Sequence, residues 1–418
     1  MEQTQYLVVG SSHAALEAIT AIRMHDPDGT LMLLTRDAHL PYSPTVLPYV
    51  VSGRSAPDNV FLRDTAFFEH NRVNVRLGVA LRKLDTERNV AELADGVEIG
   101  YAKVVLATGA SPAIPPIPGI DAVPYHVLRT LDDATRLRDA MQRSRQAVVL
   151  GAGLVGMHAA ENLVKAGANV TIVEMSAQLT SGYFDETAAS LIEQAFTENG
   201  AKIRTSSRVV RLERAGDDEI VLTLEDGTTL HADLLLVATG VRPELGYLEG
   251  SGVACDKGIL VDDTMRTNID NVWAAGDCAQ ARGFFDDAPI MNAILPDATV
   301  QGRIAGMAMA GDPGLKPYAG GVPLNTYHFF GRHAISVGSS KVPEGGEERT
   351  RFDADSGRHL KLIMKDGRLL GIYGVNEFFD AGVMAQLITR RTDLSAVKDR
   401  LFEQPLTVGR ELMSQIWR

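Results

Sequence analysis

One pattern of strand, glycine-rich turn, helix and strand occurs twice in this chain, and this duplication constrains the fold more than any other feature. In the first copy, an apolar run at residues 6–9 precedes a turn of small residues, a helix with apolar side chains at helical spacing, and a strand at 30–34. The second copy has strands at 147–150 and 169–174. Continuous apolar strands of this kind belong to parallel sheets covered on both faces, so the sequence predicts an α/β fold with two Rossmann-like dinucleotide-binding domains.

The rest of the chain completes this plan. Each copy closes on an apolar strand followed by Ala-Thr-Gly, at 104–109 and at 234–240. The Pro-rich segment 112–118 indicates a crossover between the two domains. Farther on, strands at 359–364 and 369–374 flank an Asp-Gly hairpin turn, which predicts a small C-terminal α+β domain.

The second copy carries the complete motif G-x-G-x-x-G. Gly151 allows the tight turn, Gly153 lets the backbone approach a pyrophosphate, and Gly156 lets the helix pack on the strand. The phosphate then lies at a helix N-terminus, where free N–H groups favour an anion. Glu174 ends the next strand, where a carboxylate binds both ribose hydroxyls and repels a 2′-phosphate, so the motif predicts NAD(H) rather than NADP(H). The alternative is a glycine-rich turn without a ligand, which the correctly placed strand, helix and acid disfavour.

The first copy departs from the motif. Gly10 is present, but Ser12 replaces the second glycine and Ala15 the third. A phosphate site and a purely structural turn are both open for this segment. Asp37 follows the second strand late and is a candidate for the adenosine ribose, with a solvated loop carboxylate as the alternative. The segment 267–277 predicts a buried strand that delivers Asp277 to a ribityl chain or a diphosphate, or else forms a strand-end turn.

Composition excludes several functions. The chain has only two cysteines, Cys255 and Cys278, so it cannot hold a [4Fe–4S] cluster or an internal dithiol relay by itself, and no metal site is expected. A formal charge of −12 disfavours nucleic acid and anionic membranes as partners. No apolar run approaches the roughly 18 residues of a membrane span, and no signal peptide is evident. We therefore expect a soluble, cytoplasmic protein.

Together, these motifs resemble the flavin-dependent pyridine nucleotide–disulfide oxidoreductases along the whole chain. The resemblance implies a discontinuous FAD-binding domain at 1–113 and 241–320, an NAD-binding domain at 114–240, and a C-terminal interface domain at 321–418. The helix expected at 299–310 would aim its N-terminus at the flavin, and segment 128–130 would place an Arg near it. The residues implied for FAD are Gly10, Ser12, Ala14, Asp37, Thr108, Gly109, Arg129, Asp277 and Ala298. Those implied for NAD are Gly151, Gly153, Val155, Gly156, Glu174 and Gly240.

Further segments narrow the resemblance. Residues 39–43, 47–49, 380–382 and 392–394 are similar to the ferredoxin, rubredoxin and nitrite reductase branch, and 43–49, 156–161 and 324–330 resemble the flavin subunits of 2-oxoacid:acceptor oxidoreductase complexes. This implies electron transfer between iron–sulfur partner subunits and NAD⁺/NADH, in a complex that also contains thiamine-diphosphate subunits. A stand-alone NADH:ferredoxin or rubredoxin reductase is one alternative. A redox-sensing protein that holds FAD and NAD without turnover is another.

Three departures from this branch are informative. Thr45 stands near the place of a reactive cysteine in thiol-dependent relatives, which argues against disulfide chemistry. Tyr49 and His158 replace a Lys and a Glu, leaving either a contact that gates hydride transfer or an ordinary packed aromatic and helix histidine. The thiamine-diphosphate signature, Gly-Asp-Gly followed by Asn-Asn, is absent, so the chain cannot decarboxylate an oxoacid alone. The pairs 329–330 and 378–379, all Phe, fit an interface or, by default, core packing.

Overall fold

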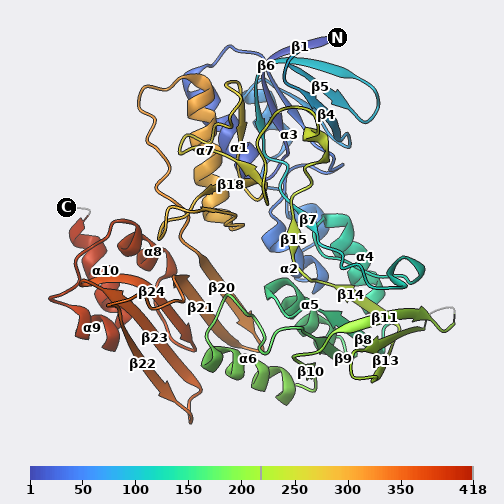
Figure 1. Ribbon diagram of the computed structural model, residues 1–418, viewed down its shortest axis with the longest axis vertical. Helices are drawn as coiled ribbons and strands as arrows, with labels where there is room; N and C mark the ends of the chain where they lie inside the picture. The colour runs from blue at the N-terminus through green and yellow to red at the C-terminus, as the bar shows by residue number, and fades with distance from the viewer. Residues whose placement is uncertain (217–218, 417–418) are drawn as a thin grey trace.

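The computed structural model describes residues 1–216 and 219–416 and has the predicted mixed α/β architecture (Figure 1). The upper lobe combines the N-terminal part of the chain with the later segment around α7 (Leu295–Ala310). The lower right lobe contains the second copy of the repeated pattern, and the lower left lobe is formed by the C-terminal part.

A mixed sheet with the order β3-β2-β1-β6-β5-β4 forms the upper lobe, and β17 pairs with the C-terminal end of β6, beyond the part of β6 that pairs with β5. The pairs β1–β2, β1–β6, β2–β3 and β6–β17 are parallel, as buried apolar strands require. Because Val272 pairs with Val104, a strand from late in the sequence completes the early sheet, which supports the proposed discontinuous domain. The strands are β1 (Glu2–Val9), β2 (Leu31–Leu34), β3 (Val73–Arg76), β4 (Leu81–Asp85), β5 (Val90–Leu93), β6 (Glu98–Leu106) and β17 (Val272–Ala274).

Helices α1 (His13–His25) and α7 pack closely on each other through small residues. A Cβ atom at Gly302 would lie 2.2 Å from the carbonyl oxygen of Ala14, and one at Gly306 would lie 2.4 Å from that of Ala18. The two backbones are therefore nearly in contact, and only glycine fits on the α7 side. This contact brings the N-terminus of α7 beside the first glycine-rich turn.

The second copy of the pattern builds a parallel sheet with the order β10-β9-β8-β14. An antiparallel sheet, β11-β12-β13, lies beside it. The elements are α4 (Leu131–Met141), β8 (Gln146–Leu150), α5 (Leu154–Lys165), β9 (Asn169–Val173), α6 (Glu186–Glu198), β10 (Lys202–Arg204), β11 (Val209–Arg214), β12 (Ile220–Leu224), β13 (Thr229–Ala232) and β14 (Leu234–Val237).

The C-terminal part is an antiparallel sheet with the order β20-β21-β24-β23-β22, packed against α8. The predicted hairpin at Asp366 and Gly367 joins β23 to β24. The elements are β20 (Leu324–Phe329), β21 (Arg332–Gly338), β22 (Glu347–Asp353), β23 (Arg358–Lys365), β24 (Arg368–Val375), α8 (Ala381–Thr389), α9 (Lys398–Glu403) and α10 (Pro405–Ile416).

Short elements outside the C-terminal part complete the fold. They are η1 (Pro44–Val46), α2 (Leu47–Val51), η2 (Pro57–Asn59), α3 (Thr65–His70), β7 (Ser111–Pro112), η3 (Ile120–Ala122), β15 (Val241–Arg242), η4 (Gly246–Leu248), β16 (Ile259–Leu260), β18 (Ala279–Arg282) and β19 (Pro289–Ile290).

Two predicted elements have different limits in the structure. The strand expected at 267–277 is limited to β17, because Thr267 N–H bonds Val272 O and the intervening residues form a turn. The helix expected at 299–310 begins earlier, at Leu295, since Pro296 occupies the first helical turn, where its missing N–H costs no hydrogen bond. The phenylalanine pairs are divided: Phe329 and Phe379 are buried, whereas Phe378 is 68 % exposed.

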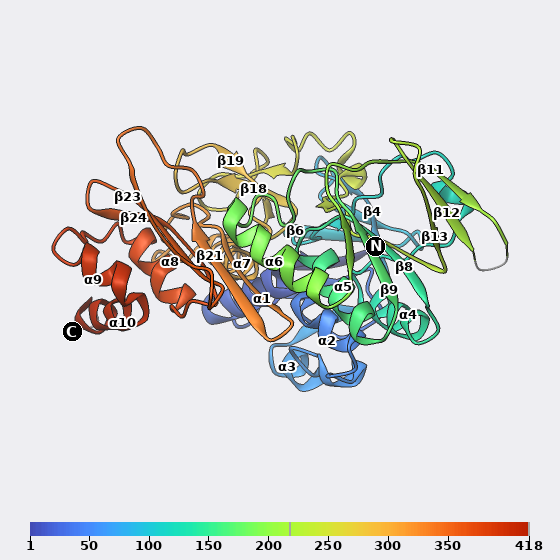
Figure 2. The ribbon, with the colours of Figure 1, turned by 90° about the horizontal axis from the view of Figure 1, so that it is seen from below.

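A contact between His359 and Asp185 joins the C-terminal sheet to α6, which Figure 2 shows alongside that sheet. His359 on β23 is fully buried, and its Nε2 lies 2.9 Å from Asp185 Oδ2. Asp185 is also the N-cap of α6 and accepts a hydrogen bond from Ala188 N–H at 2.9 Å. Burial raises the pKa of Asp185, but the hydrogen bonds from His359 and Ala188 outweigh it, and the pKa lies below its ordinary value.

We expect Gly302→Ala to destabilise the protein by about 1–3 kcal/mol, because the added methyl group would overlap the Ala14 carbonyl. Gly382→Ala in α8 is the matched control, since a Cβ there meets only Asp380 Oδ1 at 3.4 Å. Alanine also favours a helix over glycine, so the control should be neutral or slightly stabilising. Chemical unfolding of both variants measures the difference. Equal unfolding midpoints for the two variants would show that α1 and α7 can move apart without loss of stability.

Asp185→Asn should lower the free energy of unfolding at neutral pH by on the order of 2–4 kcal/mol, because it removes the anionic partner of a buried histidine. The depressed pKa of Asp185 stabilises the fold above the unfolded-state pKa near about 4. That contribution is lost as pH falls through the folded-state pKa, so the difference between variant and parent should shrink in acid.

Asp64→Asn is the control for this prediction. Asp64 is the N-cap of α3 and accepts from Phe67 N–H at 3.0 Å, and asparagine caps a helix as well as aspartate does. Denaturant titrations between neutral and acidic pH compare the two variants. If both variants lost a similar amount of unfolding free energy at every pH, Asp185 would act only as a helix cap.

Candidate functional site

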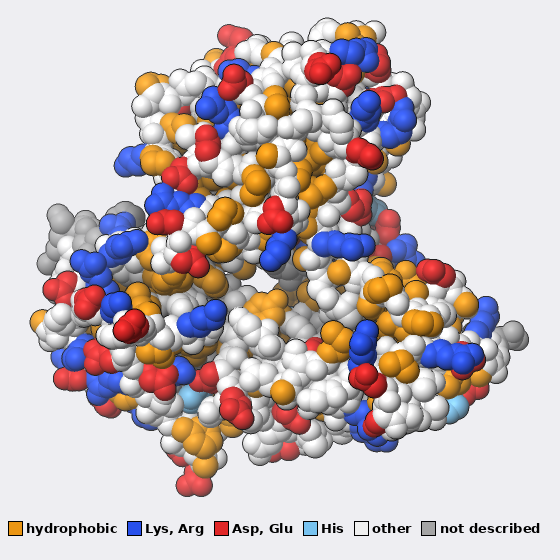
Figure 3. Space-filling model, viewed as in Figure 1, with side chains coloured by type: hydrophobic (Ala, Val, Ile, Leu, Met, Phe, Trp, Pro, Cys, Tyr) orange, Lys and Arg blue, Asp and Glu red, His pale blue; other side chains and the backbone are white. Residues whose placement is uncertain are grey.

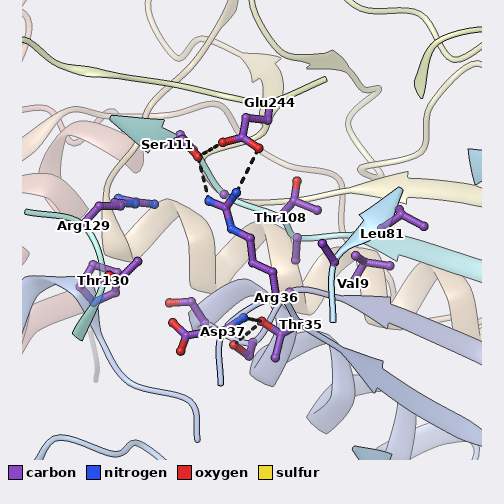
Figure 4. A pocket seen from close by; sticks show the side chains of 18 of the residues that line it. Val9, Thr35, Arg36, Asp37, Leu81, Thr108, Ser111, Arg129, Thr130 and Glu244 are labelled. Carbon is purple, nitrogen blue, oxygen red and sulfur yellow. Dashed lines mark hydrogen bonds and ion pairs between the residues drawn. The ribbon is translucent and has the colours of Figure 1, made fainter. Parts of the chain in front are cut away.

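A cavity of about 390 Å³ lies at the carboxyl ends of β1, β2 and β6, at the first glycine-rich turn (Figure 4). Open α/β sheets bind their ligands at this edge. One end of the cavity is formed by Thr35, Arg36 and Asp37 with residues 79–81, and the other by Arg129 and Thr130. Gly10, Ser12, Thr108 and Gly109 also line the cavity. The lining thus includes the first glycine-rich turn and the Thr108–Gly109 segment, which the sequence predicts to hold a dinucleotide.

The first glycine of each motif contacts the Ala-Thr-Gly segment of its own copy. Gly10 has φ +116°, and a Cβ there would lie 2.0 Å from the carbonyl oxygen of Ala107. Gly151 has φ +98°, and a Cβ there would lie 2.4 Å from the carbonyl oxygen of Ala238. In both copies the turn after the first strand is thus seated on the last strand, and only glycine fits.

The helices after these turns begin without a side-chain cap. Ser12 and Gly153 are the N-caps of α1 and α5, and neither makes a side-chain cap bond, nor does either helix have an acidic residue in its first turn. The first N–H groups of both helices are therefore available to an anion. A Cβ at Gly153 would meet no atom within 4 Å, so that glycine borders open space rather than protein. This arrangement fits the close approach of a pyrophosphate.

Glu174 lies directly beside the second glycine-rich turn. Its Oε2 accepts from Ala152 N–H at 2.8 Å and its Oε1 from Ser176 N–H at 2.7 Å. The two bonds fix the carboxylate at the end of β9, where the motif expects the ribose. Val155 is exposed in the first turn of α5, and Gly240 has φ +107° in open surroundings on the same side.

The predicted flavin residues from distant segments meet at the other end of the first cavity. Arg129 Nη2 lies 2.9 Å from Asp277 Oδ2. A Cβ at Gly276 would lie 3.2 Å from the Cβ of Ala14 and 3.7 Å from that of Ala298. Four separate segments therefore converge here, although their roles toward FAD stay predictions.

A short chain of polar side chains lies next to this point. His13 Nε2 is 2.9 Å from Ser43 Oγ, which is 2.7 Å from Thr45 Oγ1. Burial lowers the pKa of His13, so the ring is neutral at pH 7. In the first turn of α7, burial raises the pKa of Asp297 to about 6 despite hydrogen bonds from Tyr318 and Asn292.

The contact proposed between Tyr49 and His158 is not among the interactions of the described residues. Tyr49 is exposed on α2, whereas His158 packs edge-on against Tyr327 of β20, with ring centroids 4.7 Å apart. Burial lowers the pKa of His158. This geometry favours the interpretation of His158 as an ordinary helix histidine, which packs from α5 onto the C-terminal sheet.

Arg36, Ser111 and Glu244 are among the cavity-lining residues that the sequence did not predict. They lie in segments far apart in sequence, and none belongs to a recognisable motif. Asp37, by contrast, was expected to meet a ribose, but its carboxylate accepts from Tyr42 Oη at 2.5 Å and from His39 N–H at 3.0 Å. It lines the cavity while also fixing its own loop.

Other site types find little support. Within 1–216 and 219–416, no group of three or more His, Cys, Asp or Glu side chains is arranged to hold a metal ion. None of the helices described is both long and apolar enough to cross a membrane.

Figure 3 shows that the face seen in Figure 1 is hollowed at its centre, where the upper lobe meets the two lower lobes.

Comparison with known proteins gives the same picture as the geometry. Residues 4–305 match the family described as "Pyridine nucleotide-disulphide oxidoreductase". The chain is 70 % identical over its whole length to the NADH-dependent phenylglyoxylate dehydrogenase subunit epsilon of Aromatoleum evansii, covering 99 % of that protein. It is 27 % identical over 97 % of its length to the nitrite reductase [NAD(P)H] of Bacillus subtilis, of which it spans only 50 %.

The ferredoxin reductase of the CYP199A2 system from Rhodopseudomonas palustris has a similar structure. Its TM-score is 0.81 with 26 % sequence identity, over 89 % of this chain and 91 % of that one. The family predicted from the glycine motifs, the Ala-Thr-Gly strands and the Gly-Asp segment is therefore confirmed. The predicted cofactors, FAD and NAD(H), are confirmed with it. The chain belongs to the pyridine nucleotide-disulphide oxidoreductase family.

Proposed function

We propose that this protein is the FAD-containing electron-transfer subunit of an NADH-dependent phenylglyoxylate (2-oxoacid) dehydrogenase complex that forms an acyl-CoA. The 70 % identity to the epsilon subunit from Aromatoleum evansii, over the whole of both chains, is the observation that carries this proposal. In such a complex, electrons pass between iron–sulfur partner subunits and NAD⁺/NADH by way of the flavin. Thiamine-diphosphate subunits, which would act on the oxoacid, complete the proposed assembly.

The first cavity is the proposed FAD site. Gly10 and Ser12 would hold the pyrophosphate with the open N-terminus of α1, Thr108 and Gly109 would line its path, and Arg129, Asp277 and Ala298 would surround the flavin end. FAD supplies a centre that exchanges either two electrons with a nicotinamide or one electron with an iron–sulfur cluster. The protein's contribution is to orient it and to exclude water.

The second motif is the proposed NAD site. The N-terminus of α5 offers uncapped N–H groups to the pyrophosphate, and Gly153 leaves space for its approach. Glu174 would accept the ribose hydroxyls while it keeps its bond to Ala152 N–H, because a carboxylate has room for four hydrogen bonds. A 2′-phosphate would meet this negative charge at close range.

The cysteines support an electron path without a thiol. Cys278 is fully buried, its Sγ lies 3.2 Å from Leu106 O, and burial raises its pKa, so it is an inert packing residue. Burial also raises the pKa of Cys255, which lies apart in a polar loop. Thr45, near the cysteine position of thiol-dependent relatives, hydrogen-bonds Ser43 instead.

A second candidate function is a stand-alone NADH:ferredoxin or rubredoxin reductase. The structural similarity to the ferredoxin reductase of Rhodopseudomonas palustris favours it. Purification of the native chain separates the two proposals. Copurifying iron–sulfur and thiamine-diphosphate subunits would support the complex, whereas a chain that purifies alone and turns over with ferredoxin would support the reductase.

The nucleotide preference tests the role of Glu174. We expect flavin reduction by NADH to be roughly 10–100-fold more efficient than by NADPH, since the carboxylate bonds a ribose diol and repels a phosphate. Glu174→Gln should narrow this ratio, whereas Glu219→Gln, a control in the same lobe, should leave it unchanged. Stopped-flow bleaching of the flavin measures both rates. Equal efficiencies for the two nucleotides in the parent protein would contradict the assignment.

The electron path is tested with acceptors. The isolated subunit should reduce artificial one-electron acceptors with NADH and fail with disulfides and with phenylglyoxylate. The double variant Cys255→Ser and Cys278→Ser should keep turnover within about threefold, because a serine hydroxyl still donates to the carbonyl oxygen of Leu106. Loss of turnover with FAD still bound would place a cysteine on the path. Failure of the parent with all one-electron acceptors would leave the non-turnover redox sensor as the better account.

A further inference from the structure

The loop after β2 differs from the usual adenosine-binding arrangement. A dinucleotide site of this type has an acidic side chain at the end of the second strand, which accepts the ribose hydroxyls. Here that end is Thr35 followed by Arg36, and the carboxylate of Asp37 is bound to Tyr42 and His39. The position equivalent to Glu174 of the second copy is therefore the neutral Thr35, and the residue after it carries a guanidinium group.

The Arg36 side chain extends along the cavity to two residues on its other side (Figure 4). Its Nη1 lies 3.0 Å from Glu244 Oε2, and its Nη2 donates to Ser111 Oγ at 2.8 Å. Ser111 Oγ in turn donates to Glu244 Oε1. The three side chains form a closed ring of interactions, which we call the adenosine clasp.

The clasp joins the cavity to the connections between the two nucleotide-binding lobes. Ser111 belongs to β7 and Glu244 follows β15, and these two short strands are where the chain leaves the upper lobe and returns to it. Arg242 pairs with Ser111 in this antiparallel ladder. The paired crossovers hold Ser111 and Glu244 together on one side, and Arg36 reaches them from the other.

The clasp residues are too exposed to serve the stability of the fold. The Arg36 side chain is 50 % exposed and that of Glu244 is 61 % exposed, and ion pairs of this kind contribute little to folding. The hydrogen bond from Ser111, together with the ion pair to Arg36, holds the pKa of Glu244 below its ordinary value, so the carboxylate is charged at neutral pH. A weak, charged and solvent-accessible closure is one that can open.

We propose that the adenosine clasp closes over the adenosine half of FAD and retains the cofactor, with Glu244 supplying the carboxylate that the end of β2 lacks. This inference rests on the proposed placement of FAD in the first cavity. In this arrangement Arg36 is a positioning residue, because it holds Glu244 over the cavity. Release of FAD then requires the ring of Arg36, Ser111 and Glu244 to open.

Flavin release from the purified holoprotein tests the proposal. The rate is followed by the rise of flavin fluorescence after the holoprotein is diluted to a concentration at which released FAD does not rebind. We expect Arg36→Gln and Glu244→Gln each to accelerate release about three- to tenfold. The double variant should release FAD at nearly the same rate as either single variant, because the two residues act as one unit. Ser111→Ala, which removes only a hydroxyl group, should show a smaller acceleration.

Salt and a second ion pair provide the controls. Raising NaCl from about 0.05 M to about 0.5 M should accelerate release from the parent but not from the double variant, since exposed pairs are screened. Arg303→Gln removes an ion pair of the same 3.0 Å length, to Glu17, on the α1–α7 surface, and should leave release unchanged. Thermal unfolding of each apoprotein confirms that the variants are folded.

The outcomes distinguish a failure of the adenosine clasp proposal from a failure of the proposed FAD site. A purified parent protein without flavin, unable to take up FAD, would overturn the placement of the cofactor itself. The clasp proposal would be overturned, and the FAD site left intact, by either of two results. One is FAD release that is unchanged in Arg36→Gln and Glu244→Gln, and the other is release that Arg303→Gln accelerates equally.

Discussion

The contact between each glycine-rich turn and the last strand of its sheet is the constraint on which the rest of the structure depends. Gly10 lies against the carbonyl of Ala107 and Gly151 against that of Ala238, at separations that leave no room for a side chain. Because the turn is seated there, the following helix starts at the carboxyl edge of the sheet with its first N–H groups free. A dinucleotide site thus follows from one backbone contact, made twice.

The α1–α7 contact adds what the first copy needs beyond this shared geometry. Gly302 and Gly306 let α7 approach the backbone of α1, and this approach places Ala298 and the Gly276 turn beside Ala14. Asp277, which follows this turn, meets Arg129 at 2.9 Å. In the second copy, a Cβ at Gly153 would meet no atom within 4 Å, so the turn borders open space.

The sequence was sufficient for the features that repeat and insufficient for those formed by long-range pairing. Both motifs, both Ala-Thr-Gly strands and the 366–367 hairpin could be predicted because the residues that define them are adjacent in sequence. Glu244 could not, since only the pairing of β7 with β15 brings it to the cavity. The strand at 267–277 was predicted too long because apolar residues alone do not show that Thr267 bonds back to Val272. The position of His158 against Tyr327 likewise depends on a sheet whose order local patterns do not specify.

The two copies have diverged most at the acid that follows the second strand. In the second copy Glu174 keeps its place and accepts a hydrogen bond from Ala152 N–H of the glycine-rich turn, so the proposed NAD site is preformed. In the first copy Thr35 stands at that place, the carboxylate of Asp37 accepts from Tyr42, and a second carboxylate at the cavity, that of Glu244, is held by Arg36. An electron-transfer flavoprotein needs a resident flavin and an exchangeable nicotinamide. In the arrangement proposed above, the same fold meets both needs because one copy keeps its acid at the strand end, whereas the other obtains it from the crossover that carries Glu244.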